Sequence, residues 1–101
     1  MKQINKIESF LENGKIKQFP SRRTKQIEVL EWLGSKIDSQ AHYSEKEINV
    51  ILSEHIACRD FVFFRRELID LNLLKRDVYG KVYFKNKDYV RPHTIGRQQE
   101  S

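Results

Sequence analysis

Residues Tyr43 to Phe84, YSEKEINVILSEHIACRDFVFFRRELIDLNLLKRDVYGKVYF, contain the strongest fold signals of this 101-residue chain. Its apolar periodicity and turn residues predict a helix that begins at Ser44, a second helix over residues 59–71, and two short strands around Gly80. Two strands alone are only marginally stable, so the hairpin must pack on the helices. The order of elements therefore predicts an α+β domain.

The first helix of this stretch has a clear start signal. Ser44 followed three residues later by Glu47 is a capping box, in which each side chain binds the backbone N–H of the other residue. Ile48, Ile51 and Leu52 then lie on one stripe of a helix. This pattern predicts a helix with one apolar face and one solvated face.

The second helix carries an arginine pair, Arg65 and Arg66. Its apolar residues recur at spacings of three, four and three, which is one face of an α-helix; they are Phe61, Phe64, Leu68 and Leu71. The opposite face holds Arg59, Arg66 and Asp70. We expect the first face to be buried and the second to be wet.

A third helix precedes this stretch, and two flexible or basic segments flank it. Apolar residues recur every three or four positions at Ile27, Leu30, Leu33 and Ile37, which predicts a helix after Pro20. Residues 2–13 predict a short helix that ends at Gly14. The expected organisation is an N-terminal helix over 1–14, a basic linker over 15–23, a winged-helix-like domain over 24–86 and a flexible basic tail over 87–101.

The charge is mildly basic and unevenly distributed. Lys and Arg outnumber Asp and Glu by 19 to 14, a net charge of +5. Residues 13–26 contain five cations and no acid, and residues 75–97 contain seven cations against two acids. Such segments suit a polyanionic partner.

Without an apolar run of about 20 residues or a signal-peptide core, we expect a cytoplasmic chain that does not contact a membrane.

The sequence contains no recognisable catalytic or metal-binding constellation. There is no nucleophile elbow, phosphate-binding loop or dinucleotide fingerprint, so we expect no enzymatic activity and no cofactor. His42, His55 and His93 are scattered over different elements and make a poor metal set. Cys58 is either a small buried apolar residue or, near the start of a helix, a thiol with redox reactivity.

The chain resembles a bacterial family catalogued as domain of unknown function 2087, over about residues 17–84. The similar residues are Phe19-Pro20, Trp32-Leu33, YSEKEIN at 43–49, RRELID at 65–70, Gly80 and Tyr83. In that family the domain resembles a winged helix and often accompanies helix-turn-helix regulators, which implies a role in transcription regulation by association. This chain departs from the family at Phe63-Phe64, where members commonly have a small or polar residue before the arginine pair.

The first functional hypothesis is a DNA-binding transcriptional regulator, or an accessory domain of one, that binds duplex DNA through the 59–71 helix and a wing over 75–85. A recognition helix lies in the major groove, where arginine contacts guanine, and nearby cations neutralise phosphates. The candidate nucleic-acid-binding residues are Arg59, Arg65, Arg66, Lys75, Arg76, Lys81 and Lys85. The structural alternative is that Arg65 and Arg66 pair with Asp70, Glu67 or acids of the preceding helix and fix the helix packing. Arg66 and Asp70 are four residues apart, which suits such a pair.

The second hypothesis is a protein-interaction or dimerisation module with the same fold and no direct contact to nucleic acid. Four consecutive apolar residues, Phe61 to Phe64, cannot all face one core, so at least one must be exposed or covered by something else. Trp32 also lies off the apolar stripe of its helix, where it would face either the N-terminal helix or a second subunit. Trp32 and Phe63 are therefore the candidate interface residues, toward a second copy or a partner regulator protein.

Overall fold

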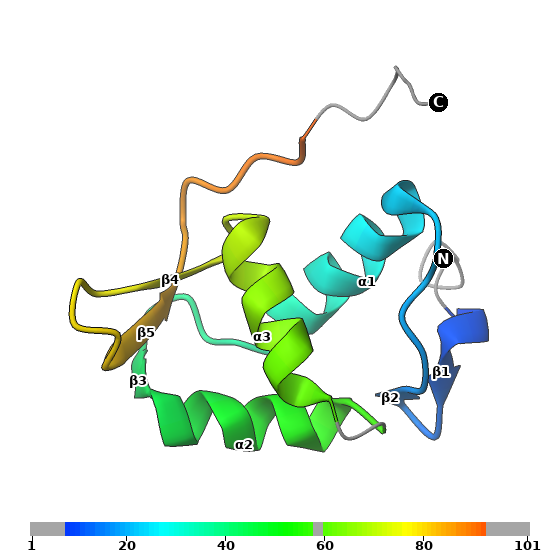
Figure 1. The fold of residues 1–101 in the computed structure, drawn as a ribbon, viewed down its shortest axis with the longest axis horizontal. Coiled ribbons are helices and arrows are strands. Elements are labelled where there is room, and N and C mark those ends of the chain that lie inside the picture. Colours follow the sequence, from blue (N-terminus) through cyan, green and yellow to red (C-terminus); the bar gives the residue numbers. More distant parts are fainter. Residues whose placement is uncertain (1–7, 58–59, 93–101) are drawn as a thin grey trace.

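The computed structural model describes residues 8–57 and 60–92. In this part the chain is an α+β fold with three helices and two small antiparallel sheets (Figure 1). In chain order the elements are β1 (Leu11–Glu12), β2 (Lys15–Ile16), α1 (Arg23–Gly34), β3 (His42–Ser44), α2 (Glu45–His55), α3 (Phe61–Asp70), β4 (Leu74–Arg76) and β5 (Val82–Lys85).

The two sheets lie at opposite ends of the helical layer. Figure 1 shows α2 along one edge of the molecule, with α3 and α1 beside it, the β1–β2 hairpin at one end and the β4–β5 loop projecting at the other. The larger sheet has the order β3-β5-β4 and is antiparallel throughout. The central strand, β5, is the last strand in the sequence. It pairs with β4 on one side and with β3, the strand just before α2, on the other.

The predicted apolar faces form the core. Phe64, Leu68 and Leu71 of the predicted helix face are buried, and Phe61 packs partly buried against the same cluster.

The capping box of α2 is present: Glu47 N–H donates to the Ser44 hydroxyl at 3.1 Å, and Ser44 N–H donates to the Glu47 carboxylate at 2.8 Å. Local signals in the sequence were sufficient for these elements.

The prediction of a helix ending at Gly14 is wrong for the residues that the structure describes. Residues 8–10 form a single 3₁₀ turn, and β1 and β2 then form a hairpin. Asn13 and Gly14 at its turn have φ angles of 55° and 78°, the two positive values that a two-residue type I′ turn needs. Ile16 is completely buried and bridges Ile56, so the predicted basic linker starts with a core strand. Residues 1–7 lie outside the described part.

The predicted flexible tail is also wrong in its first residues. Tyr89 Oη donates to Glu31 Oε2 at 2.7 Å, and Arg91 Nε donates to the same oxygen at 2.9 Å. A second Arg91 nitrogen pairs with the other oxygen of Glu31. The chain after β5 thus returns across α1 and is held there by charge-assisted hydrogen bonds. The rest of the tail, residues 93–101, lies outside the described part.

β3 corresponds to no element that the sequence predicted. Its pairing is entirely tertiary: His42, Tyr43 and Ser44 pair with Phe84, Tyr83 and Val82. Three residues with one apolar side chain carry no recognisable strand pattern, because a strand this short depends on the partner that it pairs with.

Candidate nucleic-acid interface

The two adjacent arginines of α3 have different surroundings. The Arg65 side chain is 13% exposed and donates to the Asn49 side-chain oxygen. It also pairs with Glu45 at 3.4 Å, and its guanidinium carbon lies 5.8 Å from the centroid of the Tyr83 ring. Arg65 therefore joins α3 to α2 and β5, in agreement with the structural alternative for this residue.

Arg66 lies on the exposed face of α3. The expected pair between Arg66 and Asp70 does not appear among the ion pairs of residues 8–57 and 60–92. Arg66 instead lines a shallow pocket of about 440 Å³ together with Asp60, Val62, Phe63, Glu67 and Asp70. One cation among three carboxylates does not make a basic surface. Arg59 and Cys58, which the sequence had indicated as candidates, lie outside the described residues.

The turn between β4 and β5 is fixed by one carboxylate. Asp77 Oδ1 accepts hydrogen bonds from the backbone N–H groups of Lys81 at 2.8 Å and Val82 at 3.2 Å. The bond from Lys81 is the main reason that the pKa of Asp77 lies below its usual value, and the remaining backbone bonds act in the same direction. The loop leaves Val78 and Tyr79 at its tip, 91% and 80% exposed.

The β4–β5 hairpin and the residues just after it carry several cations that form no ion pair with another described residue. Lys75, Arg76, Lys81 and Lys87 are exposed and Lys85 is half-buried. No ion pair in the part of the chain that the structure describes includes any of these five side chains. The acids of the same segment are Asp77, which is bound to the turn backbone, and Asp88. This end of the molecule therefore carries an excess of positive charge.

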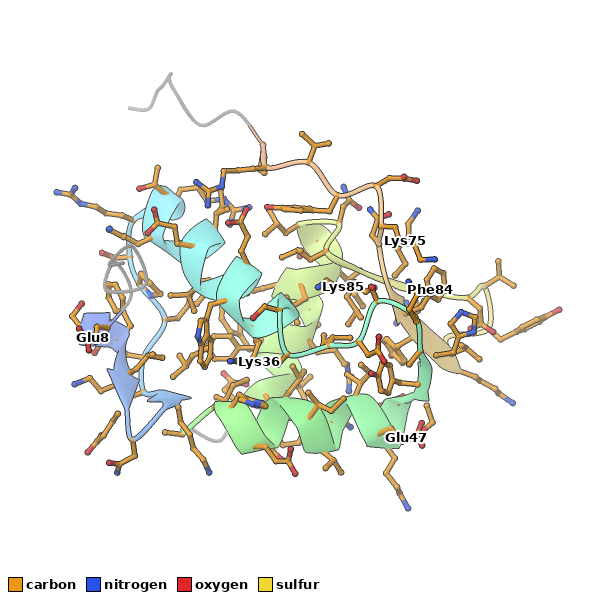
Figure 2. All side chains as sticks on the ribbon, turned by 180° about the vertical axis from the view of Figure 1, so that it is seen from behind. Glu8, Lys36, Glu47, Lys75, Phe84 and Lys85 are labelled. Carbon is orange, nitrogen blue, oxygen red and sulfur yellow. The ribbon has the colours of Figure 1, made fainter. Side chains whose placement is uncertain are left out.

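Strand alternation divides these cations between the two faces of the sheet. Arg76 pairs with Tyr83, whose ring is buried on the helix side, whereas Lys75 pairs with Phe84 on the outer side. Successive side chains of a strand point to opposite faces, so Lys85, two residues after Tyr83, lies on the helix side. Figure 2 shows Lys75 and Phe84 together at the sheet end of the molecule, far from Glu8 at the other end.

An aromatic pair on the outer face was not predicted from the sequence. His42 of β3 pairs with Phe84, and their ring centroids are 5.4 Å apart at an angle of 47° between planes. In the sequence, His42 was considered only as a metal ligand. No signal in the sequence could have found this pair, because the two residues are 42 positions apart and β3 itself was not predicted.

In the described ranges no three His, Cys, Asp or Glu side chains gather as a metal site would require.

The two candidate interface residues contact their own chain. The half-buried Trp32 ring meets His55 edge-on at 6.1 Å between centroids, and Lys36 Nζ lies 4.7 Å from the Trp32 centroid. Phe63 meets Phe19 edge-on at 5.1 Å. Within the run of four apolar residues, Val62 is the exposed member, at 42%.

The cations near the N-terminus divide into paired and exposed side chains. Arg23 lies 4.0 Å from Glu67, and Lys25 lies 3.3 Å from Glu28. Lys15, Lys17 and Arg22 are exposed. None of the helices in the residues described is long and apolar enough to cross a membrane.

The comparison with family models assigns the chain to a bacterial family. A model described as "Uncharacterized protein conserved in bacteria (DUF2087)" matches residues 15–85, and the chain belongs to this family. The match runs from β2 to the last residue of β5, so it includes the whole three-stranded sheet and all three helices. No curated protein and no solved structure matches the chain.

Proposed function

We propose that this member of the DUF2087 family is a winged-helix domain that binds duplex DNA, with a role in transcription regulation. The order helix, strand, helix, helix, hairpin, with β3 paired to the second hairpin strand, supports this assignment. In this proposal α3 is the recognition helix and residues 75–85, which include most of β4 and all of β5, form the wing.

The observation that supports the proposal is that Arg76, Lys81 and Lys85 of the wing form no ion pair with any other described residue. Lysine and arginine that neutralise phosphates release condensed counterions, and this release supplies most of the non-specific affinity for DNA. Arg76 and Lys85 are on the helix-facing side of the sheet, and Lys81 lies just before β5. They are the wing residues that we place on the DNA backbone beside α3.

The recognition helix contributes less charge than the wing. Among the described residues of its exposed face, Arg66 is the cation that could contact a base, and Arg65 is occupied by Glu45 and Asn49. Phosphate contacts position a protein on DNA, whereas base contacts supply specificity. We therefore expect binding that is salt-sensitive and depends only weakly on sequence.

The test is titration of random-sequence duplex DNA at about 50 and 200 mM salt, where phosphate contacts cause a steep loss of affinity. The double variant Arg76→Ala/Lys81→Ala should weaken binding and reduce the slope of log affinity against log salt by about 0.9 for each phosphate that is no longer neutralised. The matched control is Lys15→Ala/Lys17→Ala, which removes the same charge in and just after β2. This strand lies at the opposite end of the molecule from the β4–β5 loop (Figure 1).

The control should keep most of the salt slope. Equal losses in the two double variants would mean that net charge, and not the wing, attracts the DNA. Unchanged affinity in Arg76→Ala/Lys81→Ala would overturn the placement of DNA on the wing.

A second candidate function, self-association or binding of a partner regulator, is favoured by one observation. Val62 is 42% exposed on α3 and lines the 440 Å³ pocket next to Phe63. Val62→Ser should lower the oligomeric mass measured by light scattering if this face forms a dimer. A wild-type chain that is already monomeric at high concentration would contradict the dimer.

A further inference from the structure

We propose that the outer face of the β3-β5-β4 sheet binds single-stranded nucleic acid, with an unpaired base stacked on Phe84 beside His42 and a phosphate bound by Lys75. This inference concerns a different face and a different partner from the proposed duplex site. It does not depend on α3 or on the helix side of the wing.

The three side chains form one row across the sheet. His42 of β3, Phe84 of β5 and Lys75 of β4 are directly opposite one another in the strand register. Cross-strand neighbours point to the same face, so the two rings and the ammonium group share one surface. The buried Tyr83 side chain, one residue earlier in β5, marks the opposite face.

Phe84 is distinguished from the other phenylalanines by its surroundings. Phe64 is buried in the core, and the four others pack partly buried against it; they are Phe10, Phe19, Phe61 and Phe63. Phe84 is half-buried yet does not belong to this cluster, and the aromatic ring found near it is His42 at 5.4 Å. The Phe84 ring therefore contributes to a surface and not to the hydrophobic core.

The charge on this face complements a nucleic-acid strand. Lys75 is exposed and takes part in none of the ion pairs of the described residues, and Lys87 follows two residues after β5. Glu47, an acid in the first turn of the adjoining helix α2, is bound to the backbone N–H of Ser44 in the capping box. Cations along a strand of phosphates and an aromatic ring against a base are the two elements of single-strand recognition.

The flat ring selects for unpaired bases. In a duplex each base is stacked on its neighbours, so an aromatic side chain at a sheet surface has access to base faces only where the strand is open. Any base has a π-face, and we therefore expect little sequence preference. The proposed duplex surface lies on the other side of the sheet, where Arg76 pairs with Tyr83.

The experiment measures the affinity of the full chain for a labelled oligothymidylate of about ten nucleotides and for an abasic oligomer of the same length. The two probes carry the same phosphates and differ only in their bases. Stacking of one base predicts that oligothymidylate binds about tenfold more tightly. Phe84→Leu keeps an apolar side chain but removes the ring, and it should abolish this preference while thermal unfolding confirms that the variant folds.

A matched pair of charge variants tests which face of the sheet binds the single strand. Lys75→Ala should weaken binding of both oligomers, whereas Arg76→Ala, one residue away on the opposite face, should weaken duplex binding more than single-strand binding. An oligouridylate arm should behave like oligothymidylate, because stacking does not require a particular sugar.

Two outcomes would overturn the proposal: equal affinity for the oligothymidylate and the abasic oligomer, or a preference that survives Phe84→Leu. Duplex affinity should not change in Phe84→Leu. A chain that fails to bind duplex but prefers oligothymidylate over the abasic probe would refute the proposed function alone.

Discussion

The two faces of the three-stranded sheet differ sharply although they alternate along the same strands. On the helix side, Tyr83 and Leu74 are each 1% exposed and belong to the core. On the outer side, Phe84, His42 and Lys75 form a row that does not belong to the core cluster. Alternation along a strand thus separates side chains that stabilise the fold from side chains available for binding.

The charged residues are divided in a similar way. The ion pairs in the described part of the chain all involve helices: Arg23 with Glu67, Lys25 with Glu28, Arg65 with Glu45, and Arg91 with Glu31. The cations of the β4–β5 hairpin have no such partners among the described residues. Arg23, Arg65 and Arg91 therefore join separate elements through their ion pairs, whereas the cations of the hairpin are available to a polyanion.

The largest difference in stability between the two faces is expected at two neighbouring residues of β5, Tyr83 and Phe84. Tyr83→Ala removes a buried aromatic side chain and should lower the free energy of unfolding by about 3–5 kcal/mol. Phe84→Ala removes only a cross-strand contact and should lower it by less than about 1 kcal/mol. Urea unfolding followed by circular dichroism measures both. Similar losses in the two variants would show that the outer ring also stabilises the fold.

A smaller difference in stability is expected between Arg65, which is paired in the helical part, and Arg76, which is an exposed cation of the hairpin. Arg65→Ala removes hydrogen bonds of a largely buried charged group, and should destabilise the protein by about 1–2 kcal/mol in urea unfolding. Arg76→Ala changes an exposed side chain and should alter stability by no more than about 0.5 kcal/mol. The order should reverse for duplex affinity. Equal stability of the two variants would contradict the structural role of Arg65.

The smallest effect concerns the ion pair that anchors the chain after β5. The side-chain hydrogen bond from Arg91 holds the pKa of Glu31 below its ordinary value of 4.5. Because the folded pKa is the lower one, this stabilisation is complete above the unfolded pKa and is lost as the pH falls through the folded pKa. Glu31→Gln should cost about 0.5–1 kcal/mol at neutral pH, since the Arg91 partner is solvent-exposed.

Urea unfolding of wild type and Glu31→Gln between about pH 7 and pH 3 measures this difference, which should shrink toward acid. In an Arg91→Ala background the Glu31→Gln change should lose most of its pH dependence. A stability difference that stays constant over this range would mean that Glu31 is not held by its charge.

The N-terminal hairpin illustrates where sequence patterns compete. The apolar spacing before Asn13 favoured a helix, and Gly14 was interpreted as its stop. The dipeptide Asn13-Gly14 is also the strongest short-range hairpin signal, and the structure follows it. The deciding contact is tertiary, because Ile16 becomes completely buried beside Ile56, forty residues away.

Features that depend on neighbours within a few residues follow from the sequence alone. These include the capping box at Ser44 and Glu47, the buried faces of α1 and α3, the glycine turn of the β4–β5 hairpin and the membership of the family. The structural features among them depend on propensity, periodicity or local hydrogen bonds, which are encoded in short stretches of the chain.

Which charged and aromatic residues remain available for binding depends on long-range contacts in the folded protein. Arg65 and Arg66 are indistinguishable in a pattern of residue types, yet the first meets Glu45 and the second does not have an ion partner among the described residues. Likewise, the row of His42, Phe84 and Lys75 exists because β5 pairs with strands on both sides. Long-range pairing sets a side chain's partners, and those partners determine whether it stabilises the fold or faces a ligand.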